Sequence, residues 1–113
     1  MPRPDSAVEM ERSPYLPAIK KALEDLYGER LRGVILFGSE ARGDAEPDSD
    51  IDLLVLLEGP VEWAVEMRRA VRAVRPAQRT TVRPIHPWPV DVRKYDTADS
   101  GLYRGAKDEG IRL

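Results

Sequence analysis

The sequence contains no cysteine and one histidine among its 113 residues. Without cysteine the chain can form no disulfide, zinc–thiolate site, iron–sulfur cluster or thiol nucleophile. A single histidine, His86, excludes a metal site built from several histidines. No apolar run approaches the ~20 residues of a membrane span, and the first residues lack the apolar centre of a signal peptide. We therefore expect a cytoplasmic protein with no membrane association.

The sequence also lacks a strong excess of one charge. Its 20 acidic and 18 basic residues give a formal net charge of −2, so neither nucleic acid nor an anionic membrane attracts the whole molecule. Direct binding of nucleic acid is not expected. The length suits one domain with a substantial core. We expect a flexible N-terminal tail over residues 1–12 and a single domain over residues 13–113.

Apolar spacing predicts the order of the elements. It indicates a helix from Ser13 or Pro17 to about Gly28, and a second helix over residues 61–75 that Pro76 ends. Apolar runs at residues 33–37 and 51–57 predict two buried strands. Three prolines in residues 83–90 favour a loop or edge segment before a short strand at residues 90–93, and a short helix and strand should end the chain. The expected fold class is α/β (α+β), a small mixed sheet flanked by helices.

Two aspartates stand at the head of the second apolar run. Asp50 and Asp52 are two residues apart, so in a strand both carboxylates project from one face. Two like charges at that spacing favour a bound cation, and hard oxygen ligands suit Mg²⁺ or Mn²⁺. Taken alone, such a pair is more often two solvated loop charges. Its position against a buried strand favours a site.

A glycine and a serine follow the first apolar run. Gly38 permits a tight turn, and backbone N–H groups together with the Ser39 hydroxyl can contact a phosphate. An ordinary turn at the end of a strand would explain a lone Gly-Ser equally well. Here ten residues separate the Gly-Ser from Asp50-Ile51-Asp52, and each half follows or precedes its own apolar strand.

Residues 33–57, GVILFGSEARGDAEPDSDIDLLVLL, resemble the signature of the minimal nucleotidyltransferases of the DNA-polymerase-β-like superfamily. The resemblance implies a nucleotidyltransferase palm, two Mg²⁺ ions (or Mn²⁺), and transfer of a nucleoside monophosphate from an NTP, with ATP the expected substrate. It also implies a third carboxylate on a later strand. Asp91, in the Val-Asp-Val stretch, is the candidate, and Asp96 and Asp99 are better explained as helix caps.

The same resemblance assigns the site residues. Asp50, Asp52 and Asp91 would hold the metal ions and carry catalysis, and Gly38, Ser39 and Arg42 would bind the nucleotide. Arg42 is the one basic residue in an otherwise acidic loop, and a local salt bridge to Asp44 or Glu46 explains it equally well.

The expected acceptor follows from how little chain remains after Asp91. The last 22 residues are too few for an acceptor-binding domain. Small members of the family that the chain resembles act with a separately encoded helical HEPN-type toxin, and the antitoxin attaches AMP to a tyrosine of that partner. We expect this function. Two alternative functions stay open: a palm that neutralises a partner by binding alone, and adenylylation of a small hydroxyl compound. Assembly of the chain into a homo-oligomer also stays open.

Arginines are concentrated in residues 61–83, where six of them stand against two glutamates. Arg68, Arg72 and Arg75 fall on one helical stripe, with Arg69 beside it. The simpler interpretation is that these arginines form a solvated face of the helix. The more specific one is that they bind the acidic surface of a protein or an RNA backbone. No aromatic residues alternate with these arginines to stack on bases, which disfavours RNA.

Overall fold

The computed structural model describes residues 15–38, 41, 43, 46, 48–97 and 100–113. The N-terminal tail expected over residues 1–12 lies outside these residues. The helices are α2 (Tyr15–Tyr27), the 3₁₀ turn η1 (Gly28–Arg30), α4 (Trp63–Ala73), α5 (Arg75–Gln78), α6 (Val92–Asp96) and α7 (Gly101–Glu109). The strands are β1 (Leu31–Phe37), β2 (Ile51–Leu57), β3 (Ile85–Asp91) and β4 (Ile111–Arg112).

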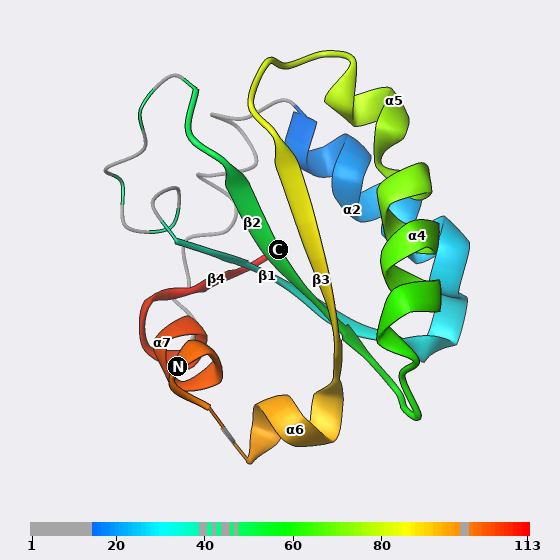
Figure 1. Ribbon diagram of the computed structural model, residues 1–113, viewed down its shortest axis with the longest axis vertical. Helices are drawn as coiled ribbons and strands as arrows, with labels where there is room; N and C mark the ends of the chain where they lie inside the picture. The colour runs from blue at the N-terminus through cyan, green and yellow to red at the C-terminus, as the bar shows by residue number, and fades with distance from the viewer. Residues whose placement is uncertain (1–14, 39–40, 42, 44–45, 47, 98–99) are drawn as a thin grey trace.

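The four strands form one mixed sheet in the order β3-β2-β1-β4 (Figure 1). β1 pairs antiparallel with β2 and with β4, whereas β2 and β3 run parallel. A parallel pair needs a crossover connection, and α4 and α5 supply it. The expected class, a small mixed sheet with flanking helices, is confirmed.

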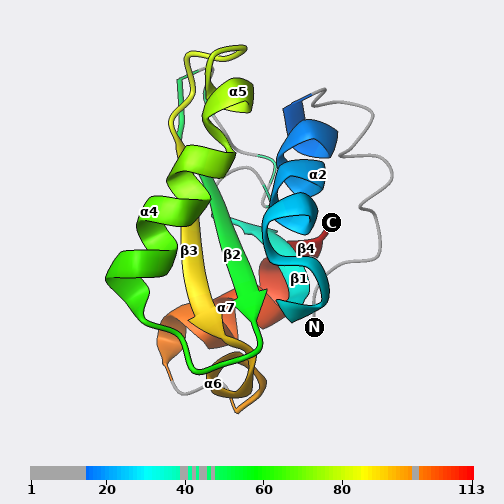
Figure 2. The same ribbon diagram turned by 90° about the vertical axis from the view of Figure 1, so that its right-hand side faces the viewer.

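Side chains of the central strands divide the core between the two faces of the sheet. Leu53 and Val55 of β2 belong to one cluster with apolar residues of α2, α4 and α5. Leu54 and Leu56 belong to a second cluster that includes Tyr95 of α6 and Ala106 of α7. All residues of β2 from Leu53 to Leu57 are fully buried, as the continuous apolar run predicts for a central strand. Figure 2 shows α2 and α4 side by side, apart from α6 and α7.

β3 begins earlier than the sequence indicates. The strand covers residues 85–91, and the residues from Val92 onward form α6 instead of continuing it. Pro87 and Pro89 lie inside the strand because β3 is at the edge of the sheet. The Ile51 N–H donates to the Pro84 carbonyl at 2.7 Å, so the even-numbered residues point their polar backbone groups at β2. The nitrogens of both prolines therefore face the open edge, where no donor is needed.

The other helices follow the predicted pattern with one difference. Pro76 does not end the helical path: α4 ends at Ala73, and Pro76 occupies the first turn of the separate helix α5. Proline is accepted there because the first N–H groups of a helix have no partner inside it. The C-terminal helix and strand are confirmed as α7 and β4. No helix among the described residues is long and apolar enough to cross a membrane.

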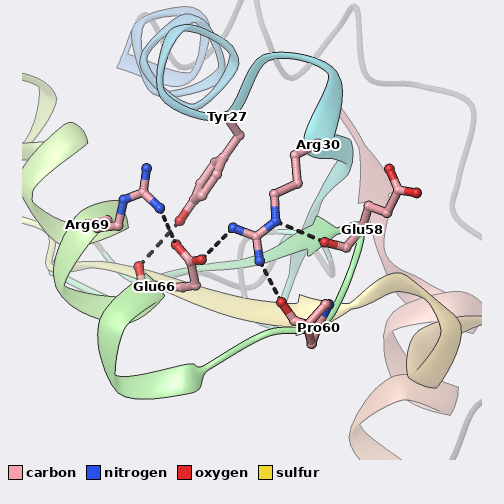
Figure 3. A network of polar contacts seen from close by, with 6 residues as sticks. All are labelled: Tyr27, Arg30, Glu58, Pro60, Glu66 and Arg69. Atoms are coloured by element: carbon pink, nitrogen blue, oxygen red, sulfur yellow. Dashed lines mark hydrogen bonds and ion pairs between the residues drawn. The ribbon is translucent and has the colours of Figure 1, made fainter.

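A polar network joins α2, α4 and the turn after β2 (Figure 3). Glu66 is 5% exposed, and its carboxylate pairs with Arg30 and with Arg69, the latter at 3.2 Å. The Arg30 guanidinium also donates to the carbonyls of Glu58 at 2.9 Å and Pro60 at 2.8 Å. Because these carbonyls come directly after β2, Arg30 fixes the connection that leads from the sheet into α4.

Candidate functional site

Three strands present one row of side chains near the start of β2. Phe37 of β1 pairs with Asp52, and Asp52 in turn pairs with His86 of β3. Directly paired residues of adjacent strands project from the same face of a sheet, so these three side chains lie in a row across it. Their face is the one that Leu54 and Leu56 share with α6 and α7. The row thus lies on the α6–α7 side, beyond the part of that face that Leu54 and Leu56 occupy.

Gly38 lies against Asp52. Its φ is +75°, a left-handed conformation that glycine adopts without strain. A Cβ atom at this position would lie 2.8 Å from Oδ2 of Asp52, which is closer than a carbon and an oxygen tolerate. The turn after β1 therefore places the backbone at Gly38, where there is no side chain, directly against the Asp52 carboxylate. The fold thus places the glycine turn beside one of the two aspartates, Asp52.

The other aspartate, Asp50, has a histidine beside it. His86 Nε2 lies 3.4 Å from Oδ2 of Asp50, and the two side chains are 41% and 55% exposed. Sequence patterns indicated no partner for His86, because the prolines around it concealed the strand that places it beside Asp50. The alternation His86, Trp88 and Val90 on one face of a strand is the signal that would have found it.

Asp91 does not join the pair, and its assignment as the third carboxylate is corrected by the strand register. It pairs with Leu57, five residues beyond Asp52, which is about 16 Å along the strand. Alternation along β3 also gives it the same parity as Ile85, which packs on the opposite face of the sheet from Asp52. Its carboxylate instead accepts the Arg93 N–H at 2.9 Å and caps α6.

Two of the expected nucleotide-binding residues, Ser39 and Arg42, lie outside the described residues, as does Asp99. Asp96 is the last residue of α6, and the cap of α7 is Ser100, whose hydroxyl accepts the Tyr103 N–H at 3.3 Å. The structure therefore brings together Gly38, Asp50, Asp52 and His86 among the residues that it describes.

The carboxylates of Asp50 and Asp52 suit a divalent cation that is already bound to phosphate. Among the described residues no three His, Asp or Glu side chains form a ready cluster for a metal ion. Mg²⁺ in proteins is commonly held by one or two carboxylates together with phosphate oxygens of the substrate, and it keeps several waters. Asp50 and Asp52 supply the carboxylates for such an arrangement. The residues present thus fit a magnesium–nucleotide complex better than a metal ion alone.

The predicted arginine stripe lies away from this row. Arg68 and Arg72 of α4 and Arg75 of α5 line a surface groove of about 280 Å³, together with Met67 and Val71. Two other arginines of the same stretch have partners inside the fold. Arg69 pairs with Glu66, and Arg83 donates to the Ser49 carbonyl at 2.9 Å.

Comparison with known proteins identifies relatives. The model of the family described as "Nucleotidyltransferase domain" matches residues 16–113. Among curated proteins, "Putative protein adenylyltransferase MJ0604" of Methanocaldococcus jannaschii is 39% identical over 46 residues, which is 41% of this chain and 46% of that protein. "Putative protein adenylyltransferase MJ0141" of the same organism is 41% identical over 49 residues, 43% of this chain and 50% of that protein. The match thus spans about half the length of each curated relative.

Solved structures show the same fold. A crystal structure of a toxin-antitoxin with AMP-PNP superimposes with a TM-score of 0.64 at 21% identity, over 85% of this chain and 69% of the other. A crystal structure of "a putative nucleotidyltransferase from Sulfolobus solfataricus" gives a TM-score of 0.58 at 24% identity, over 99% of this chain and 89% of the other. At these identities the likeness concerns the fold alone.

Proposed function

Because the chain belongs to the nucleotidyltransferase domain family, we propose that it is a Mg²⁺-dependent nucleotidyltransferase that moves AMP from ATP onto a hydroxyl of a partner protein. The observation that carries the proposal is the contact of Gly38 with Asp52 at the head of β2, with Asp50 beside it. The curated relatives named as protein adenylyltransferases support a protein acceptor. The toxin-antitoxin neighbour supports a toxin as that partner, and we propose the helical HEPN type.

In the proposed reaction the acceptor oxygen forms a bond to the α-phosphorus of ATP while the bond from that phosphorus to the bridging oxygen breaks. Pyrophosphate leaves, and the hydroxyl proton passes to a carboxylate or to water. The divalent ion bound with the nucleotide supplies charge neutralisation on the phosphates. Asp50 and Asp52 orient that ion, and the backbone at Gly38, together with Ser39 and Arg42, holds the triphosphate.

His86 takes the place beside the aspartates that Asp91 was expected to fill. Its ring nitrogen contacts Asp50, so we propose that it fixes the orientation of that carboxylate. This makes His86 a positioning residue. The two carboxylates would then bind the metal–nucleotide complex without a third acid from β3.

The correction of Asp91 favours a second candidate function. With two carboxylates at the site instead of three, a palm that binds its partner without transferring a nucleotide fits the same geometry. The two functions differ in whether they need a charged carboxylate at Asp52. A binding protein needs its fold, whereas a transferase also needs the charge of Asp52.

The test is transfer of label from [α-³²P]ATP, with Mg²⁺, into a co-encoded neighbouring protein or into host lysate. Wild type is compared with Asp52→Asn and with Asp25→Asn, which removes the same charge from an exposed position on α2. The transferase predicts a labelled, protease-sensitive product with wild type and Asp25→Asn and none with Asp52→Asn. Neutralisation of a co-encoded toxin by Asp52→Asn, with no labelling by any of the three proteins, would establish the binding function instead.

A further inference from the structure

The groove on α4 and α5 lies apart from the candidate site. We call it the arginine groove, and its lining residues are Met67, Arg68, Val71, Arg72 and Arg75. Its volume of about 280 Å³ is just below the roughly 300–1,000 Å³ of small-ligand pockets, so it suits an inserted side chain better than a free ligand. Ala70 places α4 in the core cluster on the face of the sheet opposite the carboxylate row. A molecule bound in the arginine groove therefore leaves that row open.

The three arginines of this groove have no partner in the described part of the fold. No side-chain hydrogen bond or ion pair joins Arg68, Arg72 or Arg75 to a described residue, whereas Arg69 pairs with Glu66. Arg68 precedes Arg72 by four residues, a spacing at which like charges destabilise a helix. The helix dipole favours a cation in the last turn, which accounts for Arg72 but not for Arg68. An anionic partner would relieve the repulsion that α4 carries.

An apolar stripe runs along the same helix. Trp63, Met67 and Val71 follow one another at intervals of four residues, so they share one side of α4. Trp63 is 53% exposed and Val71 is 41% exposed, and Met67 is half-buried. Tryptophan, methionine and arginine are enriched at protein–protein interfaces and lysine is depleted, and every basic residue of the stretch 61–83 is an arginine. The composition of this side of α4 is therefore that of an interface with a protein.

Charge alone does not choose between the carboxylates of a protein and the phosphates of a nucleic acid, because guanidinium groups bind both. The apolar stripe favours the protein. Met67 and Val71 have no flat ring, and Trp63 alone cannot stack a run of bases. An amphipathic helix meets both features of the surface, since its apolar side chains can enter the groove while carboxylates beside them accept hydrogen bonds from the arginines.

We propose that the arginine groove is a docking site for a partner protein that presents an acidic amphipathic helix. The inference goes beyond the proposed function, because a partner held on this face is compatible with nucleotide transfer and with neutralisation by binding alone. A second copy of the chain is the other acidic occupant. It is disfavoured because its acidic residues at the head of β2, Asp50 and Asp52, belong to a strand and the residue before it, and not to a helix with an apolar face.

The test measures binding with no nucleotide present. Its probes are a fluorescein-labelled helical peptide with a leucine stripe flanked by glutamates, the same peptide with lysines in place of the glutamates, and single-stranded poly(U) RNA. Wild type is compared with Arg68→Glu, with Val71→Gln, and with Lys94→Glu, which reverses a charge at an exposed position on α6. Arg68→Glu places a carboxylate four residues before Arg72, and glutamine has a higher helix propensity than valine. Both groove variants should therefore unfold at a urea midpoint no lower than that of wild type.

We expect wild type to bind the glutamate peptide and not the lysine peptide, with an affinity that falls as the salt concentration rises. Arg68→Glu should weaken this binding about tenfold or more and Val71→Gln about threefold or more, whereas Lys94→Glu should stay within about twofold of wild type. Amide resonances of ¹⁵N-labelled wild type that shift on addition of the peptide should belong to residues 63–78, the span of α4 and α5.

No binding of the glutamate peptide by wild type would overturn the proposal, as would equal binding by Arg68→Glu. Tighter binding of poly(U) than of the peptide, lost in Arg68→Glu and kept in Val71→Gln, would assign the groove to nucleic acid. Self-association of wild type in sedimentation that Arg68→Glu abolishes would assign the groove to a second copy of the chain. Since nucleotide is absent throughout, these outcomes are separate from the transfer of label: docking can hold where transfer by wild type fails, and transfer can hold where docking fails.

Discussion

Asp52 on β2 and His86 on β3 are direct neighbours in the parallel register of the sheet. The register continues unbroken from this pair to the pair of Leu57 and Asp91. A strand cannot slip by five residues without moving its whole apolar set, so the end of β3 that reaches the aspartates is fixed as the His86 end. This relationship decides which residues the candidate site can use.

The register predicts that Asp91→Asn keeps nucleotide transfer within about twofold of wild type, since the change lies far from the site. Asparagine is also a good helix cap, so the free energy of unfolding should change little. Transfer of label and urea unfolding, measured beside Asp52→Asn, check both expectations. Abolished transfer in a folded Asp91→Asn protein would show that the site recruits Asp91 after all.

His86→Ala should lower transfer by about 10–100-fold, the usual effect of removing a group that orients a ligating carboxylate. The cause is loss of the contact that holds Asp50. His86→Gln, which retains a donor for that carboxylate, should recover part of the rate with the same unfolding midpoint. Equal rates for the alanine and wild-type proteins would remove His86 from the site.

Gly38→Ala is predicted to lower the free energy of unfolding by about 1–2 kcal/mol, because its left-handed conformation disfavours a Cβ atom. It should also reduce nucleotide binding, because that atom would press on Asp52. Gly43→Ala is the matched control: its φ is +80°, and its Cβ would have no neighbour within 4 Å. Both variants should lose stability in urea, Gly38→Ala at least as much as Gly43→Ala, and only Gly38→Ala should lose affinity for ATP. Equal affinities would mean that the contact of Gly38 with Asp52 is without consequence.

Glu66→Gln should destabilise the fold by about 1.5–3 kcal/mol, since the buried carboxylate would lose its charged hydrogen bonds to Arg30 and Arg69. Urea unfolding at neutral pH measures the change, and Glu24→Gln, on the exposed side of α2, should fall within about 0.5 kcal/mol of wild type.

The same carboxylate predicts an acid dependence. Burial by itself raises the pKa of Glu66, but the hydrogen bond and charge of Arg30, with the charge of Arg69, outweigh burial and lower the pKa below its usual 4.5. Its contribution is therefore present above the pKa of the unfolded chain and is lost as the pH falls through the lower, folded value. The gap in stability between wild type and Glu66→Gln should narrow in acid, and a constant gap would contradict this account.

Tyr27 predicts an alkaline dependence. Burial, and then the negative charge of Glu66, raise the pKa of its hydroxyl from 10.0 to about 12. The folded state therefore holds this proton more tightly than the unfolded chain, and the resulting stability is full below pH 10 and lost as the pH rises toward 12. The free energy of unfolding of wild type, relative to that of Tyr27→Phe, should therefore decrease as the pH rises through this interval. A difference that does not change with pH would show that the hydroxyl titrates normally.

Sequence patterns predicted the elements whose apolar residues follow one clear period. β2 is the clearest example, because its continuous run from Ile51 to Leu57 is the pattern of a strand covered on both faces. The turn at Gly38 and the aspartate pair were found for the same reason, since each directly adjoins such a strand. Local patterns therefore predict the part of the candidate site that directly adjoins these two strands.

The position of β3 could not be read in this way. Its prolines are opposed to a strand by intrinsic preference, and only the open edge of the sheet makes them acceptable. The error over Asp91 follows from this, because choosing a third carboxylate required the register between β2 and β3. Register is a property of the assembled sheet, and no spacing within residues 83–93 specifies it.

The prolines of β3 also bear on how the protein meets other chains. Pro87 and Pro89 turn nitrogens without a hydrogen toward the outer side of the edge strand. Two carbonyl groups of a strand added from another molecule would therefore have no N–H donor there. β4, at the opposite edge, is two residues long. The sheet therefore resists extension into an intermolecular one, which protects it from edge-to-edge aggregation. A partner is left to bind through helical and loop surfaces, which include the ones that border the carboxylate row.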